Sequence, residues 1–216
     1  MNKRFAIFDM DGTLVDSMVF WERLGREYLA SKGITQGIEW VLEQIIPMTM
    51  SESSALFLEA FSIPGTPESV AAEMNAMMEE HYRTDIPLKT GVEEYLAQLS
   101  QNGVIMCVAS STAKELMYAC LSRLGVADRF AFLLSCEEVG AGKSQPDVYW
   151  EAARRLSAKP WEIAVYEDAL YAARTAKEAG FYTVAVFDDS EKNQWEELLD
   201  LAHEAIFDWG KAAQDL

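Results

Sequence analysis

The sequence predicts an α/β protein with a doubly wound parallel sheet and a small helical domain inserted after the first strand. Three observations predict this fold. Short apolar runs of strand length alternate with helical patterns, chiefly after residue 84. These runs are continuously apolar, as in strands that are buried on both faces of a parallel sheet. Between residues 15 and 83 only helical periodicity is visible, which predicts a helical insertion.

The first strand is expected at Phe5–Phe8, four apolar residues that directly precede an Asp-rich turn. Gly12 gives that turn conformational freedom. The insertion is then expected to hold four helices, over residues 18–31, 38–46, 51–61 and 67–82. We expect residues 1–14 and 87–216 to form the α/β core and residues 15–86 to form the helical domain.

The rest of the chain alternates helices and strands, as in a parallel sheet that helices cover on both faces. Strands are expected over residues 104–109, 130–134, 163–166 and 181–187. Helices are expected over residues 91–101, 113–124, 146–156 and 169–179. Such sheets bind their ligands at the carboxyl ends of the strands. Polar residues at those ends are therefore the candidate site residues.

Composition limits the classes of function. The chain has 216 residues, half of them hydrophobic, enough for the core of one domain with an insertion or of two small domains. Eighteen Lys and Arg against 35 Asp and Glu give a net charge of −17, which disfavours nucleic acids and anionic membranes as partners. The odd number of cysteines, three, predicts a reducing compartment, here the cytoplasm. No signal peptide or membrane span is visible, and a monomer is compatible with the sequence, which does not fix the oligomeric state.

Two carboxylates stand two residues apart where the first strand ends, at Asp9 and Asp11. The pair is costly, because the charges repel each other unless a cation or a shared proton compensates them. A nucleophile and a proton donor beside a metal ion would explain both charges. An Asp-rich turn that caps the following helix would explain them as well, and this segment alone does not decide between the two.

Further polar residues follow later strands. Ser110 begins a Ser-Ser-Thr run, and hydroxyls with exposed backbone N–H groups at a helix start can bind an anion. Lys143 lies in a Gly-rich turn, and Glu167 and Asp168 follow another strand. Taken one at a time, these residues also fit a helix cap, an exposed loop lysine and an acidic helix start.

The four motifs together are more specific. The residues from Phe8 to Ser17 are Phe-Asp-Met-Asp-Gly-Thr-Leu-Val-Asp-Ser, followed in order by Ser110, by Lys143 in a Gly-Lys-x-x-Pro-Asp turn and by Glu167-Asp168. This order resembles the haloacid dehalogenase-like (HAD) superfamily of aspartate-nucleophile phosphotransferases, over essentially the whole chain. The four-helix insertion resembles the small cap of its first subfamily, which includes phosphoglycolate phosphatase and β-phosphoglucomutase.

The resemblance implies a role for each motif residue. Asp9 would be the nucleophile that forms an aspartyl phosphate, and Asp11 would donate and accept protons. Thr13 would support the turn. The implied phosphate ligands are Ser110, Ser111 and Lys143. The implied ligands of a Mg²⁺ ion are Asp9, the backbone carbonyl of Asp11, Glu167 and Asp168. Because the dehalogenases of the superfamily lack the second aspartate, Asp11 implies phosphoryl chemistry rather than carbon–halogen cleavage.

Three residues depart from the family pattern. Ser144 replaces the first proline of the usual Gly-Lys-Pro-x-Pro-Asp turn, which implies a less rigid loop. Ala169 and Ala172 replace the serine and the glycine of the usual Glu-Asp-Ser-x-x-Gly motif. The first of these alanines removes a hydroxyl that could stand near the metal ion, while the carboxylates remain.

The insertion is expected to select the substrate. Trp21 stands where relatives that isomerise β-phosphoglucose carry a histidine, and no Arg or Lys occurs between Gly33 and Glu80. Trp21 and Met48 could line a pocket for the leaving group, or they could belong to the core of the insertion.

The sequence therefore predicts a Mg²⁺-dependent phosphatase of small phosphomonoesters that acts through an aspartyl-phosphate intermediate on a small phosphorylated metabolite. A hexose-phosphate mutase of the β-phosphoglucomutase type is the alternative enzyme. A non-catalytic phosphate-binding module is the alternative from another class of protein.

Overall fold

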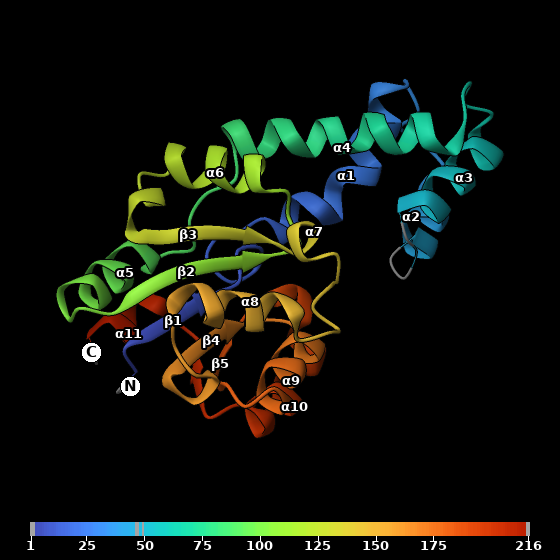
Figure 1. The fold of residues 1–216 in the computed structure, drawn as a ribbon. Helices are drawn as coiled ribbons and strands as arrows, with labels where there is room; N and C mark the ends of the chain where they lie inside the picture. The colour runs from blue at the N-terminus through green and yellow to red at the C-terminus, as the bar shows by residue number, and fades with distance from the viewer. Residues whose placement is uncertain (1–2, 46–47, 49, 215–216) are drawn as a thin grey trace. The chain divides into compact units, whose positions relative to one another are not determined.

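A computed structural model describes residues 3–45, 48 and 50–214 of the chain (Figure 1). The chain divides into two compact units, Met1–Ser17 with Ile86–Leu216, and Met18–Asp85. We call them the α/β unit and the helical unit. None of the helices among the described residues is long and apolar enough to cross a membrane.

The α/β unit is built on a six-stranded sheet in the order β3-β2-β1-β4-β5-β6, with every neighbouring pair parallel. The strands are β1 Phe5–Phe8, β2 Ile105–Ser110, β3 Phe130–Ser135, β4 Ile163–Glu167, β5 Tyr182–Val186 and β6 Glu204–Ile206. β1 lies in the middle of the sheet, and Phe5 pairs with Ile105 on one side and with Ile163 on the other. The predicted parallel sheet is confirmed.

Helices connect successive strands (Figure 1). The α-helices of this unit are α5 Val92–Gln101, α6 Lys114–Arg123, α7 Cys136–Val139, α8 Asp147–Leu156, α9 Leu170–Glu178, α10 Trp195–Leu201 and α11 Trp209–Gln214. Short 3₁₀ turns are η1 Ala127–Arg129, η2 Pro160–Glu162 and η3 Asp189–Gln194. The sequence patterns did not predict β6, α7, α10 or α11, which have three to seven residues each.

Successive residues of a strand point to opposite faces of a sheet, and both faces of this sheet are covered. On one face Ile7 belongs to an apolar cluster with Tyr149 of α8. On the other face the ring of Phe8 stacks on Tyr166 at 4.2 Å, and Trp209 of α11 stacks on the same tyrosine at 6.0 Å. The predicted doubly wound arrangement is therefore confirmed.

Among its described residues the helical unit contains four helices, α1 Met18–Ser31, α2 Glu39–Ile45, α3 Met50–Phe61 and α4 Pro67–Thr84. The predicted four-helix insertion is confirmed, although the expected end of the second helix at residue 46 lies outside the described residues. Thr66 and Ser69 cap the start of α4, each side chain accepting the other's backbone N–H. The core includes Leu24, Tyr28 and Phe57, all at most 2% exposed.

Candidate active site

The predicted site residues of the α/β unit converge where the central strands end. Asp9 directly follows β1, Ser110 ends β2, and Glu167 ends β4. Because β2 and β4 both pair in parallel with β1, their carboxyl ends lie at the same edge of the sheet. Asp168 follows β4, and Lys143 lies in the loop between α7 and α8.

Four charged side chains form a buried cluster at this edge. The Lys143 ammonium donates a hydrogen bond to Asp9 Oδ1 and another, of 2.7 Å, to Glu167 Oε1. The carboxylates of Asp9, Glu167 and Asp168 each offer an oxygen within 4.8 Å of the others. All four residues are at most 6% exposed. We call these four residues the acid–lysine cluster.

The charges in this cluster do not balance, because one lysine faces three carboxyl groups. Burial raises the pKa of Asp9 well above its usual range, although Lys143 acts against that effect. Burial and Glu167 raise the pKa of Asp168 to about 7. Burial alone would lower the pKa of Lys143, but Asp9 and Glu167 outweigh it and raise that pKa. The lysine is therefore positively charged, and the cluster would gain from further positive charge.

Hydroxyl groups surround the carboxylate of Asp11, which is not part of this cluster. Ser17 donates to its Oδ1 at 2.7 Å and Thr112 to its Oδ2 at 2.6 Å, while the Ser110 hydroxyl lies at 3.5 Å from Oδ2. Gly12, with φ at 75°, forms the turn after Asp11. Asp11 is partly exposed, whereas Asp9 is buried. The two aspartates of the motif therefore occupy different surroundings.

The other predicted residues of this unit lie nearby. The Thr13 hydroxyl donates to Asp168 Oδ1 at 3.0 Å, which ties the turn after β1 to the segment after β4. The Ser110 hydroxyl accepts the backbone N–H of Thr112 at 3.1 Å. The hydroxyl of Ser111, in contrast, is directed to Cys136 Sγ at 3.8 Å, and Ser111 is exposed.

Trp21 and Met48 belong to the helical unit. The Trp21 indole donates to the Tyr82 hydroxyl of α4 at 3.3 Å, and 36% of Met48 is exposed. Trp21 thus contacts another helix of its own unit. A contact of either residue with a substrate stays a prediction.

Three residues near the predicted ones were not predicted from the sequence. The Tyr149 hydroxyl donates to Glu167 Oε1 at 2.7 Å, on the same oxygen that Lys143 contacts. Thr112 contacts Asp11 more closely than Ser110 does. Asp188, which follows β5 and is 6% exposed, is one of the charges that raise the pKa of Asp168. Asp188 could have been found from the sequence, because it is an acidic residue directly after the predicted strand 181–187. Tyr149 could not, because its position in an apolar helix pattern is that of an ordinary core residue.

The departures from the family pattern have visible local consequences. Ser144 lies in a turn that the Gln145 N–H closes onto the Gly142 carbonyl at 2.9 Å, so the loop keeps a backbone bond without the usual proline. Ala169 stands at the N-cap of α9, where no side chain accepts a backbone N–H. Ala172, which lies in α9, is fully buried.

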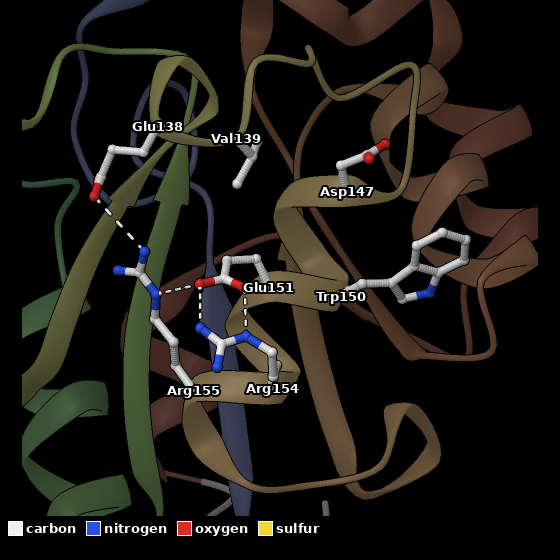
Figure 2. Close-up of a pocket in the computed structure, with 7 residues that line it drawn as sticks. All are labelled: Glu138, Val139, Asp147, Trp150, Glu151, Arg154 and Arg155. Atoms are coloured by element: carbon white, nitrogen blue, oxygen red, sulfur yellow. Dashed lines mark hydrogen bonds and ion pairs between the residues drawn. The ribbon is translucent and has the colours of Figure 1, made fainter.

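A hollow of about 510 Å³ lies elsewhere on this unit, along α7 and α8 (Figure 2). It is lined by Glu138, Val139, Asp147, Trp150, Glu151, Arg154 and Arg155. Glu151 in the hollow accepts hydrogen bonds from Arg154 at 2.7 Å and from Arg155 at 2.8 Å. None of its lining residues belongs to the acid–lysine cluster, so the hollow is not the candidate active site.

A doubly wound parallel sheet with a buried cluster of carboxyl groups at the carboxyl ends of its middle strands defines a Rossmann-like α/β protein. A sequence model of one family of such proteins matches residues 6–186. The chain belongs to this family, the haloacid dehalogenase-like hydrolases. The predicted family is therefore confirmed.

Relatives cover most of the chain at moderate identity. Hexitol phosphatase B of Escherichia coli (strain K12) is 27% identical over 84% of this chain and 82% of its own length. Validoxylamine A 7'-phosphate phosphatase of Streptomyces hygroscopicus subsp. limoneus is 29% identical over 85% of each chain. The crystal structure of a putative β-phosphoglucomutase from Thermotoga maritima superposes with a TM-score of 0.83 over 98% of this chain and 97% of that one. At 22% identity, this last likeness shows the fold alone.

Proposed function

We propose that the protein is a Mg²⁺-dependent phosphatase that hydrolyses small phosphomonoesters, in particular sugar phosphates, through an aspartyl phosphate on Asp9. The observation that carries the proposal is the acid–lysine cluster, in which Lys143 contacts both Asp9 and Glu167. A lysine held against the nucleophile would neutralise the oxygens of an incoming phosphoryl group. The two related phosphatases described above, which are named for a hexitol and for validoxylamine A 7'-phosphate, support the reaction class and the size of the substrate.

The reaction would take two steps. In the first step a carboxylate oxygen of Asp9 bonds to phosphorus, and the bond between phosphorus and the ester oxygen breaks. Asp11, in its carboxylic acid form, gives its proton to the departing oxygen. In the second step a water oxygen bonds to phosphorus, the Asp11 carboxylate takes a proton from that water, and the bond from phosphorus to Asp9 breaks. Inorganic phosphate leaves, and both aspartates return to their first forms.

The surroundings of the two aspartates support this division of roles. Asp9 is buried and paired with Lys143, which suits a nucleophile that must be held in one position. Asp11 is partly exposed and accepts hydrogen bonds from the hydroxyls of Ser17 and Thr112. Such a side chain can exchange a proton with a leaving group and then with water.

The donor set fits Mg²⁺. The side chains of Asp9, Glu167 and Asp168 offer three hard oxygen ligands within 4.8 Å of one another, and we propose the Asp11 backbone carbonyl as a fourth ligand. An ion bound there would neutralise charge on the transferring phosphoryl group. Thr13 and Tyr149 each hold one of these carboxylates by a hydrogen bond, and so orient Asp168 and Glu167 respectively.

The phosphatase reaction is favoured over the two alternatives. A hexose-phosphate mutase must hold the second phosphate of a bisphosphate, and the helical unit offers no Arg or Lys between Gly33 and Glu80. A non-catalytic binding module would not need a proton donor such as Asp11, whose carboxylate accepts hydrogen bonds from the hydroxyls of Ser17 and Thr112.

The test is turnover with and without Mg²⁺. The protein should release phosphate from p-nitrophenyl phosphate and from sugar phosphates in the presence of Mg²⁺, and excess EDTA should abolish the release. Full activity in EDTA would contradict the metal assignment. With β-glucose 1-phosphate and a trace of glucose 1,6-bisphosphate, formation of glucose 6-phosphate instead of free phosphate would establish the mutase alternative.

A further inference from the structure

A largely buried ion pair lies outside the acid–lysine cluster, between Lys89 and Asp188. Lys89 precedes α5, and its ammonium lies 2.6 Å from Asp188 Oδ2 and donates to the Phe187 carbonyl at 2.9 Å. The other oxygen of Asp188 accepts the backbone N–H and the hydroxyl of Ser190, at 3.0 and 2.5 Å. The two charged side chains are 14% and 6% exposed. The Lys89 side chain is therefore fixed to the carboxyl end of β5.

The backbone of Lys89 is fixed at a second place. Its N–H donates to the Leu14 carbonyl at 3.0 Å, and the Asp16 N–H donates to the Pro87 carbonyl at 3.0 Å. Residues 14–16 and 87–89 thus form a short antiparallel ribbon within the α/β unit. Its two strands are the segments by which the chain leaves this unit and returns to it.

The ribbon is continuous with the turn that carries Asp11. The N–H groups of Leu14 and Val15 both donate to the Met10 carbonyl, at 2.9 and 3.0 Å. The Gly12 N–H donates back to the Val15 carbonyl at 3.1 Å. A displacement of the ribbon would therefore move the turn after Asp11.

We propose that Lys89 is a positioning residue, which through Asp188 anchors the ribbon to β5 and so holds Asp11 in place for proton transfer. The inference rests on the proposed function. Its physical basis is that Asp11 lies in a turn rather than in a strand, so its position depends on what holds the turn. A displacement of about 1 Å at a catalytic group can cost on the order of a hundredfold in rate. A buried ion pair adds little to stability in general, but its geometry is specific.

The test compares two phosphate esters that differ in their need for a proton. The double variant Lys89→Met/Asp188→Asn removes both charges, so no unpaired charge is left buried. Its kcat/KM should fall about tenfold or more on glycerol phosphate, whose alkoxide must be protonated by Asp11 as it leaves. It should fall less than about threefold on p-nitrophenyl phosphate, because p-nitrophenolate departs without a proton. The matched control is Lys192→Met, which removes an exposed lysine 4.0 Å from Asp189 and should leave both values unchanged.

A second measurement does not depend on catalysis. Amide hydrogen exchange should become faster at Asp16 and Lys89 in the double variant, while Ile7 and Val165 in the central strands stay protected. The single variant Lys89→Arg keeps the positive charge, so its kcat/KM on glycerol phosphate should fall less than that of the double variant.

Two outcomes would overturn the inference. Equal losses on both esters, together with faster exchange throughout the sheet, would show that the pair only stabilises the fold. Unchanged kinetics on both esters would show that Asp11 does not depend on Lys89. If the wild type hydrolysed neither ester, the proposed function itself would be wrong, and that result is separate from the other two.

Discussion

The stability of the metal-free protein should fall as the pH rises, and Asp168 should be a main cause. Burial and Glu167 raise the pKa of this carboxyl from 3.8 to about 7, although Lys143 and Thr13 act against the rise. In the unfolded chain the same group ionises near its ordinary value. Folding is therefore most favourable below the unfolded pKa, and stability is lost as the pH rises through the folded pKa.

The size of the effect follows from the two pKa values. One pH unit between folded and unfolded pKa corresponds to about 1.4 kcal/mol, so the difference between 3.8 and about 7 corresponds to about 4 kcal/mol. About 3 kcal/mol of this would be lost between pH 5 and pH 8, a range in which urea unfolding can be measured. This is a large share of the 5–15 kcal/mol by which typical domains are stable.

The assay is urea unfolding in EDTA at pH 5 and pH 8. Asp168→Asn keeps the shape of the side chain but cannot ionise, so this variant should lose about 3 kcal/mol less than the wild type over the same range. Asp189→Asn is the control, because that side chain is 85% exposed and should leave the pH dependence unchanged. Mg²⁺ should stabilise the wild type more at pH 8 than at pH 5, since ionised carboxylates bind the ion. Equal pH dependence of the wild type and Asp168→Asn would refute the reasoning.

Four further predictions concern single side chains. Asp9→Asn should abolish turnover and keep the fold, and near-normal phosphate release would end the covalent mechanism. Asp11→Asn should lower kcat/KM on alkyl phosphates by roughly 10²–10⁴-fold, and a loss below about tenfold would move the proton transfer to another group. Tyr149→Phe should raise the Mg²⁺ concentration needed for half-maximal turnover, because Glu167 loses a hydrogen bond. The control Tyr95→Phe removes the contact between two other buried tyrosine hydroxyls and should leave that concentration unchanged. Equal Mg²⁺ requirements in the two variants would contradict this prediction. Trp21→Ala should change the ranking of phosphate esters by about ten- to two-hundredfold in kcat/KM, whereas equal losses on all esters with a lowered melting temperature would assign Trp21 to the core of the helical unit.

The sheet could be predicted because its strands are continuously apolar. In β1 and β4 nearly every residue is buried, so the sequence shows a run that no surface element would have. β6 escaped prediction for the opposite reason, since only Ile206 of its three residues is buried. The helix α7 has four residues and no apolar periodicity, and Ser135 holds its start through a capping box with Glu138.

The site could be predicted as far as residue types and strand ends allow. Asp9, Lys143, Glu167 and Asp168 are brought together because the ends of parallel strands meet at one edge. Which hydroxyl approaches Asp11 depends on the turn after β2, and no pattern in Ser110-Ser111-Thr112 distinguishes the third residue from the others. The contact from Tyr149 to Glu167 depends on how α8 packs against the sheet, which the local sequence does not show.

The central place of β1 also affects how the protein is made. Among the strands of this sheet β1 is synthesised first, whereas its partner β2 follows the helical unit and its partner β4 follows most of the α/β unit. At typical rates of synthesis β4 follows β1 by roughly ten to thirty seconds. Both edges of Phe5–Phe8 stay unpaired until β2 emerges, and one edge stays unpaired until β4 emerges, a state that exposes nascent chains to aggregation. We expect the nascent chain to depend on chaperones until residues 163–167 emerge, while the helical unit Met18–Asp85, which is compact by itself, can fold as soon as it is complete.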